Sequence, residues 1–241
     1  MRTERKCLYS DINIKKYTWN CIEDIWVSQQ NDWTCQLAAL RIVLRYYHMD
    51  IPEKDLVRIL EYEKFNIFDF GTYLPFIGVI ALQLGFDISY RTVIANEYPS
   101  ESSIISSDDT VKKIILDDMQ NSGEGESIIQ AYNAFLKILN LGGKIYLHQP
   151  YSPPTFREIK NALRKGVVMA LVSGREYYNI NEDWKHALVL VSDGTDNFMV
   201  LDDFEKKGFD CYVDWGKNLA NAKKYDWTMW KGRMIEFEKK E

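Results

Sequence analysis

Apolar residues recur at helical spacing through the first half of the chain. In residues 35–47, CQLAALRIVLRYY, the apolar positions form one face, and Arg41 and Arg45 lie four residues apart on one side. Asp32 and Thr34 are both suitable N-caps for this predicted helix. Further helices are predicted at roughly 53–61 after Pro52, 71–84 before Gly85, 110–119, 128–141 and 156–164 after Thr155.

The last third of the chain changes to short apolar and β-branched runs of strand length, separated by turn signals such as Asp193-Gly194. Strands are predicted at 87–93, 144–148, 167–172, 187–191, 198–201 and 227–237. Because most helices precede most strands, the order favours a segregated α+β domain over a βαβ repeat.

The 241 residues are within the size range of one large domain, and no internal repeat or low-complexity linker divides them. We expect a single domain over 1–241, with its core at about 25–237. Residues 94–125 are rich in Ser, Asp and Glu and are expected to form an exposed insertion. This insertion is either a lid over a groove or a surface loop.

Composition limits the classes of partner. Hydrophobic residues make up 46% and charged residues 27%, and the net charge is -5, so no uniform basic field is available for nucleic acid or an anionic membrane. The longest apolar run, Leu74 to Phe86, is interrupted by Gln83 and is too short to span a bilayer. The N-terminus is charged and lacks a secretory signal, so we expect a soluble, cytoplasmic protein. The oligomeric state is left open.

The four cysteines form no CxxC pair, and the three histidines do not cluster near them. No metal site and no cofactor is therefore expected. A disulfide framework is also not expected in a chain of this size without a signal. Cys7, Cys21 and Cys211 are interpreted as reduced thiols, mostly buried as small apolar residues.

Cys35 differs from the other cysteines because it begins a predicted helix. The N-terminus of a helix carries partial positive charge and unpaired N–H groups, which favour a thiolate over a thiol. The same N–H groups can hold the oxyanion of a tetrahedral intermediate. Gln29, six residues upstream, is a candidate for the second oxyanion donor, and Gln30 is its competitor.

A nucleophilic thiol needs a base, and three histidines are available. His48 is at the far end of the same helix, roughly 20 Å from Cys35 at about 1.5 Å per residue. His148 is expected in a solvated loop before Gln149-Pro150. His186 opens the apolar run HALVLVSDG, where a sheet would hold the ring rigidly, so it is the predicted base.

Asp202 ends the next predicted strand, sixteen residues after His186. The two strands would pair antiparallel, so the end of the second would lie beside the start of the first. The Asp202 carboxylate would then accept the second imidazole N–H and fix the tautomer. Asp203 is the alternative, since adjacent strand residues face opposite ways.

The run from Gln29 to Tyr47, QQNDWTCQLAALRIVLRYY, resembles the first motif of the bacteriocin-processing, double-glycine leader peptidases. The run from His186 to Asp202 resembles their second motif, a His that opens an apolar strand and an Asp that closes the next. The chain is also similar to the related guanylyl-cyclase-like domain family, with further likeness around 68–86 and 155–174. Together the similarity covers about residues 25–237.

This resemblance implies a papain-like cysteine proteinase fold, in which an N-terminal helical half with the nucleophile at a helix N-terminus packs on an antiparallel sheet. It implies a triad of Cys35, His186 and Asp202, with Gln29 as the oxyanion donor. Two positions depart from the family pattern: Thr34 replaces Asp before the cysteine, and Gln36 replaces Gly after it. Gln36 adds a side chain beside the nucleophile.

The predicted function is acyl transfer through a Cys35 thioester to water, as a peptidase or amidase acting on a peptide or amide. An alternative is transfer to an amine, which would make the protein an amide-forming acyltransferase or transpeptidase. Trp26, Trp33 and Trp184 would favour that reaction if they shielded the thioester from water. A third alternative, motivated by the two departures, is a catalytically silent peptide-binding module.

Overall fold

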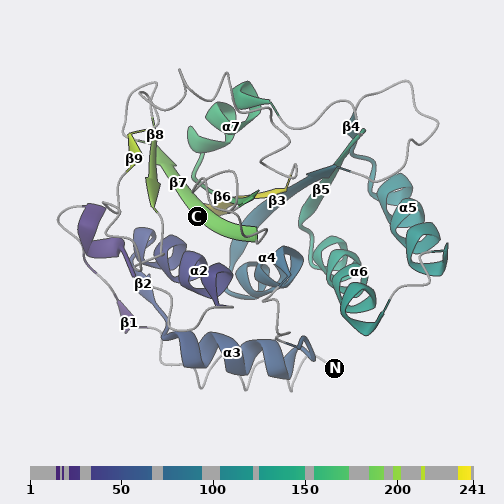
Figure 1. Ribbon diagram of the computed structural model, residues 1–241, viewed down its shortest axis with the longest axis horizontal. Helices are drawn as coiled ribbons and strands as arrows, with labels where there is room; N and C mark the ends of the chain where they lie inside the picture. Colours follow the sequence, from purple (N-terminus) through teal and green to yellow (C-terminus); the bar gives the residue numbers. More distant parts are fainter. Residues whose placement is uncertain are drawn as a thin grey trace.

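Helices cover both faces of a single large sheet (Figure 1). The computed structural model describes residues 15–16, 18, 22–27, 34–66, 73–93, 104–121, 125–149, 155–173, 185–192, 198–201, 213–214 and 233–239. The described helices are η1 (Ile22–Ile25), α2 (Cys35–Tyr46), α3 (Glu53–Tyr62), α4 (Leu74–Gln83), α5 (Asp108–Asn121), α6 (Glu126–Asn140) and α7 (Phe156–Leu163). Of these, η1 is a single turn of 3-10 helix.

The described strands of the large sheet run in the order β4-β5-β3-β10-β6-β7-β8-β9. Their bounds are β3 (Phe86–Val93), β4 (Ile104–Ile105), β5 (Lys144–His148), β6 (Val167–Ser173), β7 (Lys185–Ser192), β8 (Phe198–Leu201), β9 (Val213–Asp214) and β10 (Met234–Lys239). A separate antiparallel pair joins β1 (Lys15–Lys16) to β2 (Met49–Asp50). The α+β class predicted from the order of elements is confirmed.

One pair of strands departs from the antiparallel sheet that was predicted. β3 and β5 are parallel, with Val93 opposite His148, whereas the other described pairs are antiparallel. Parallel neighbours need a crossover connection, and here the chain passes through β4, α5 and α6 before it returns as β5. The prediction of a purely antiparallel sheet is therefore wrong at this pair.

The two faces of the sheet are covered unequally. α2, α4 and α6 pack against one face, and α7 packs on β6 and β7 from the other (Figure 1). Along β3 the side chains alternate accordingly: Tyr90 is buried among the helices, with its ring 4.9 Å from that of Phe135 on α6, whereas Arg91 faces the α7 side. We call these the α2 face and the α7 face.

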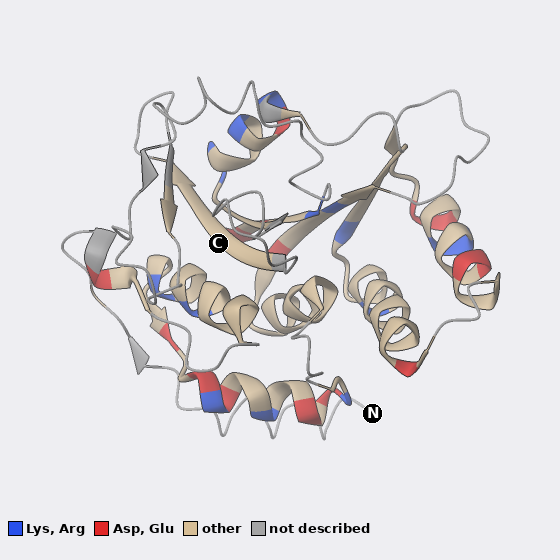
Figure 2. Cartoon of the chain, in the orientation of Figure 1, with Lys and Arg blue, Asp and Glu red and all other residues tan. Residues whose placement is uncertain are grey.

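α4 lies in the middle of the helical layer, with α2, α3, α6 and the sheet around it. Every residue from Leu74 to Leu82 is buried, and no charged side chain interrupts the helix, in contrast to the charged outer turns of α3 and α5 (Figure 2). Gly78 has no room for a larger residue, since a Cβ there would be 2.9 Å from side-chain carbons of Ile138 and Ile88. This close approach joins α4 to α6 and β3.

Several predicted element boundaries are confirmed by local geometry. Pro52 occupies the N-cap position of α3, and Gly85, at φ +90°, follows α4 in the left-handed conformation. Thr155 and Glu158 form a reciprocal capping box at the start of α7. The strand predicted at 227–237 occurs as β10, Met234–Lys239, and residues 227–232 lie outside the described part of the chain.

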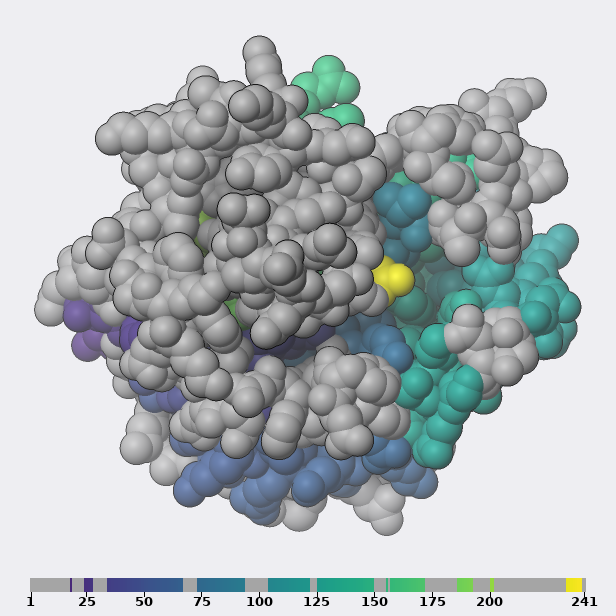
Figure 3. Space-filling model, viewed as in Figure 1, coloured from purple at the N-terminus to yellow at the C-terminus, as the bar shows by residue number. Residues whose placement is uncertain are grey.

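The described part of the segment 94–125 contributes to the domain core. β4 pairs with β5, and α5 buries Val111, Ile114 and Ile115 on its inner face. Its outer turns are exposed, and α5 and α6 form one rim of the face seen in Figure 3. Within the described residues, no helix combines the length and apolar character needed to cross a membrane.

Candidate active site

Cys35 is the first residue of α2, as predicted. Thr34 occupies the N-cap position, and its carbonyl accepts hydrogen bonds from the N–H groups of Leu37 (2.9 Å) and Ala38 (3.0 Å). The Cys35 thiol is not in a disulfide, and the residue is 9% exposed. The N–H groups of Cys35 and Gln36, the first two residues of α2, have no acceptor within the helix, so they are the candidate donors to an oxyanion.

His186 is fully buried at the second position of β7. α2 packs directly on this strand, and Ala187 and Val189 belong to the same core cluster as Cys35. The helix that begins at the predicted nucleophile and the strand whose second residue is the predicted base are therefore in contact.

The far end of α2 shows how this helix lies along the sheet. Tyr47, directly after the helix, donates a hydrogen bond of 2.9 Å from its hydroxyl to the carbonyl oxygen of Phe237, which is opposite Val167 at the start of β6. α2 spans about 18 Å, and β6 covers about 17 Å from Val167 to Val172. Val172 is paired with His186. The C-terminal end of α2 therefore lies near the start of β6, and His186 lies beside the other end of that strand.

The alternation of side chains along β7 constrains how His186 reaches the thiol. Ala187, Val189 and Val191 are in the core cluster on the α2 face, whereas His186 belongs to the alternate set with Leu188, on the side of α7. By this alternation the imidazole lies on the α7 face, opposite the face on which α2 packs.

The other two histidines occupy different environments. His48 is exposed after the C-terminal end of α2, with φ 63°, in agreement with its exclusion as a base. The prediction that His148 lies in a solvated loop is wrong, because it is the last residue of β5 and is fully buried. It is enclosed because β5 lies between β3 and β4, so that His148 is opposite Val93 on one side and Ile104 on the other.

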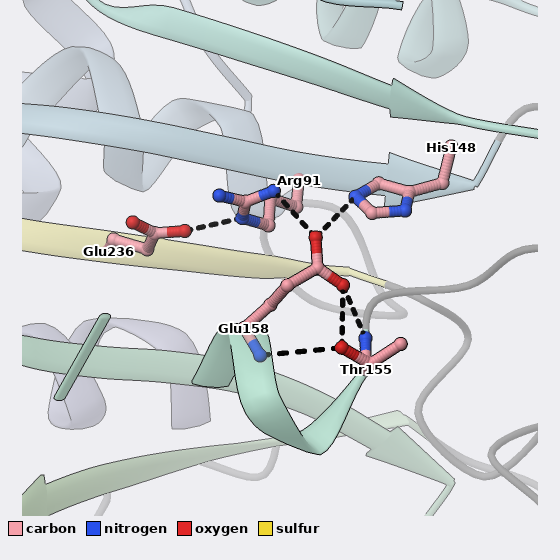
Figure 4. A network of polar contacts seen from close by, with 5 residues as sticks. All are labelled: Arg91, His148, Thr155, Glu158 and Glu236. Atoms are coloured by element: carbon pink, nitrogen blue, oxygen red, sulfur yellow. Dashed lines mark hydrogen bonds and ion pairs between the residues drawn. The ribbon is translucent and has the colours of Figure 1, made fainter. Parts of the chain in front are cut away.

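His148 belongs to a polar network on the α7 face (Figure 4). The Arg91 guanidinium, from β3, donates through NH1 to Glu158 Oε1 on α7 (3.0 Å) and through Nε to Glu236 on β10. His148 Nε2 lies 3.9 Å from the same Glu158 oxygen. Arg91 also lies over the Tyr146 ring, 4.3 Å from its centroid. Sequence reasoning missed this network, because its members come from four separate elements.

The antiparallel pairing predicted for the strands after His186 is confirmed, with Val189 opposite Leu201 and Ser192 opposite Phe198. The carboxylates that follow this hairpin and the glutamines that precede α2 lie outside the described residues, so their roles stay predictions. They are Gln29, Gln30, Asp202 and Asp203. Among the described residues, no group of three or more His, Cys, Asp or Glu side chains is arranged to hold a metal ion.

Comparison with known proteins adds no relative. The chain matches no family model and no curated protein, and its fold matches no solved structure. The inference of function therefore depends on the residues of this site and their geometry.

Proposed function

We propose that this protein is a cysteine-dependent acyl-transfer enzyme, a peptidase or amidase that acts on a peptide or amide through a thioester at Cys35. One observation carries the proposal: Cys35 begins a helix that packs on the strand in which His186 is the second residue. A thiol at a helix N-terminus and an imidazole held by a sheet are the two groups that thiol acyl transfer requires.

A papain-like arrangement is part of this proposal. α2, α3 and α4 precede most of the sheet in the chain, and α2 packs on β6 and β7, which form an antiparallel pair. These features agree with a helical half that carries the nucleophile and a sheet that carries the base. The resemblance of the two sequence motifs to the double-glycine leader peptidases supports the same assignment.

In the first half of the reaction, His186 takes the proton from the Cys35 sulfur, and the thiolate attacks the carbonyl carbon of the substrate. The carbonyl oxygen becomes an oxyanion that the N–H groups of the first turn of α2 stabilise. The C–N bond then breaks, the protonated imidazole gives its proton to the leaving amine, and a thioester remains on Cys35.

In the second half, His186 removes a proton from water, and the resulting hydroxide equivalent attacks the thioester carbon. Breakdown of this intermediate releases the carboxylic acid and returns the proton to the sulfur. Asp202 would hold the imidazole tautomer and Gln29 would donate to the oxyanion, as the motif resemblance predicts.

Substitution of the nucleophile is the direct test. A library of fluorogenic peptide amides identifies a cleaved substrate, and intact-mass spectrometry detects the acyl-enzyme on the native chain. We expect Cys35→Ala to lose at least about a thousand-fold in kcat/KM and to form no acyl-enzyme, because the thioester cannot form. Full cleavage by this variant would contradict the proposal.

The base is tested with a matched pair of histidine substitutions. His186→Gln should lower kcat by at least about a hundred-fold and remove the acidic limb of the pH profile, because no imidazole then accepts the thiol proton. His48→Asn is the matched control, because it removes an exposed imidazole just after the end of α2. Asn tolerates the positive φ of that position. Equal activity of the two variants would exclude His186 as the base.

A further inference from the structure

His148 is a buried imidazole that the proposed mechanism does not use. Its Nε2 lies 3.9 Å from Oε1 of Glu158, which is too long for a hydrogen bond but short enough for an ion pair when the imidazole carries a proton. His148 ends β5 and Glu158 lies in the first turn of α7, so the contact brings together the two ends of the connection between these elements (Figure 4).

Glu158 is bound through both of its carboxylate oxygens. Oε1 accepts a hydrogen bond from the Arg91 guanidinium (3.0 Å), and Oε2 accepts from the backbone N–H (2.7 Å) and the hydroxyl (2.9 Å) of Thr155. Each of these partners is a donor, which is the environment of an ionised, acceptor-only carboxylate. The His148 ring therefore faces a negative charge.

The polar network carries more negative than positive charge while His148 is neutral. Its two carboxylates, Glu158 and Glu236, share the single guanidinium of Arg91, and these three side chains are only 15–19% exposed. Charge that is largely removed from water is costly unless it is paired. One proton on His148 makes the positive and negative charges of the network equal in number.

The other described groups around His148 leave this surplus uncompensated. On β5 itself, alternation places Tyr146 and Lys144 on the same face, but Tyr146 lies under the Arg91 guanidinium and Lys144 is exposed at the far end of the strand. The opposite residues on β3 and β4 are apolar, α5 and α6 pack on the other face of β5, and Arg157 of α7 is exposed. Burial of the imidazole opposes protonation, so the two effects compete.

We propose that His148 is a pH-dependent latch, whose protonated imidazole pairs with the Glu158 carboxylate at mildly acidic pH and ties the first turn of α7 to the end of β5. In this balance the surplus negative charge outweighs the burial of the ring. The added stability is present below about pH 6.5, where histidine ordinarily titrates, and is lost as the pH rises through the titration of the folded imidazole.

The latch is independent of acyl transfer at Cys35, since it depends only on the network of the α7 face. It still bears on the candidate site, because α7 packs on β6 and β7, and β7 carries His186. Acidic pH therefore holds α7 more firmly over the strand of the predicted base.

A double-mutant cycle at two pH values tests the latch. His148→Gln removes the titrating ring, and Glu158→Gln removes the charge while Gln can still complete the capping box. Urea unfolding at about pH 5 and about pH 8, on either side of the histidine range, gives the equilibrium constant of unfolding of the native chain, both single variants and the double variant.

We expect His148→Gln to raise the unfolding constant about ten-fold more at the lower pH than at the higher pH. In the Glu158→Gln background the same substitution should show no such gain, because the anionic partner is absent. A loss of native stability relative to His148→Gln as the pH falls, or an effect equal at both pH values, would overturn the latch.

A measurement on the imidazole itself keeps the test decisive if His148→Gln does not fold. NMR spectra of chains with isotope-labelled histidine, with His148 assigned through the backbone of β5, follow its protonation in the native chain and in Glu158→Gln. We expect its midpoint to lie at a lower pH in Glu158→Gln. An imidazole that stays neutral at about pH 5 in the native chain, or an unchanged midpoint, would exclude the latch and leave the assignment of Cys35 untouched.

Discussion

The two faces of the sheet are joined to their helices in different ways. On the α7 face, Arg91, Glu158 and Glu236 are 15–19% exposed, and their opposite charges are paired in one network. On the α2 face, the core is apolar, and the Tyr47 hydroxyl at the end of α2 donates to the Phe237 carbonyl. Ion pairs therefore join α7 to the sheet, whereas apolar packing joins α2, α4 and α6 to it.

The α7 face shows how such a network stabilises the fold. Glu158 accepts from Arg91 through Oε1, while its Oε2 accepts from the backbone N–H of Thr155 (2.7 Å) in the capping box. One glutamate therefore joins the N-terminus of α7 to the middle of the sheet. Because Glu158 both caps α7 and pairs with Arg91, loss of Arg91 should weaken the contact of α7 with the sheet as well as the ion pairs.

The largest effect on stability is expected from Arg91→Leu. This change leaves two partly buried carboxylates without their common cation, so the free energy of unfolding should fall by about 3 kcal/mol. Urea unfolding followed by tryptophan fluorescence measures it. Arg58→Leu is the matched control, because Arg58 pairs with Asp55 at 3.4 Å with its side chain 62% exposed, and it should change stability by less than about 0.5 kcal/mol.

Arg91→Leu also tests whether the polar network on the α7 face affects the reactivity of Cys35. Because the network joins β3, α7 and β10, whereas α2 packs on β6 and β7, Arg91→Leu should leave the alkylation rate of folded Cys35 unchanged within about two-fold. A large loss of Cys35 reactivity without loss of stability would show that the network serves the candidate active site, and the two faces could no longer be treated as separate in function.

A smaller effect is expected from Tyr47→Phe on the α2 face. Burial raises the pKa of Tyr47 to about 12, so its hydroxyl remains protonated and donates to the Phe237 carbonyl. Loss of this bond should cost about 1 kcal/mol of unfolding free energy. Tyr62→Phe, at a residue 38% exposed, is the control and should be neutral. Equal unfolding midpoints for the two variants would show that Tyr47 does not anchor α2.

The smallest effect is the pH dependence that Asp50 contributes. Burial alone raises the pKa of the Asp50 carboxyl, but hydrogen bonds from Arg45 and Arg41 outweigh it, so the pKa lies below its ordinary value of 3.8. A lowered pKa stabilises the folded chain above about pH 4, and that contribution is lost as the pH falls below this value. At pH 7, Asp50→Asn should cost less than about 1 kcal/mol.

Urea unfolding at pH 7 and pH 3 measures this contribution. The difference in stability between the native chain and Asp50→Asn should shrink at the lower pH, because the Asp50 carboxyl of the unfolded chain then binds a proton that the folded chain, with its lowered pKa, binds less readily. A difference that stays constant between the two pH values would exclude the ion pairs with Arg41 and Arg45 as its source.

Residues a few positions apart predicted much of the local structure. Pro52, Gly85 and the Thr155–Glu158 capping box mark helix ends that the structure confirms. The β7–β8 hairpin also followed from two apolar runs around a turn. The parallel pair of β3 and β5 and the burial of His148 did not follow, because both depend on where a chain segment returns after two helices.

In the candidate site, too, local sequence predicted some features and only the tertiary structure decided the others. The sequence by itself determined that Cys35 begins a helix and that His186 begins a strand, because helix starts and strand alternation depend on neighbouring residues. Only the tertiary structure decided that α2 packs on β7, that His186 alternates with the α2-facing residues, and that Arg91 meets Glu236 across 145 positions of chain. Such contacts depend on which strands pair and in which register, and local sequence patterns do not specify that choice.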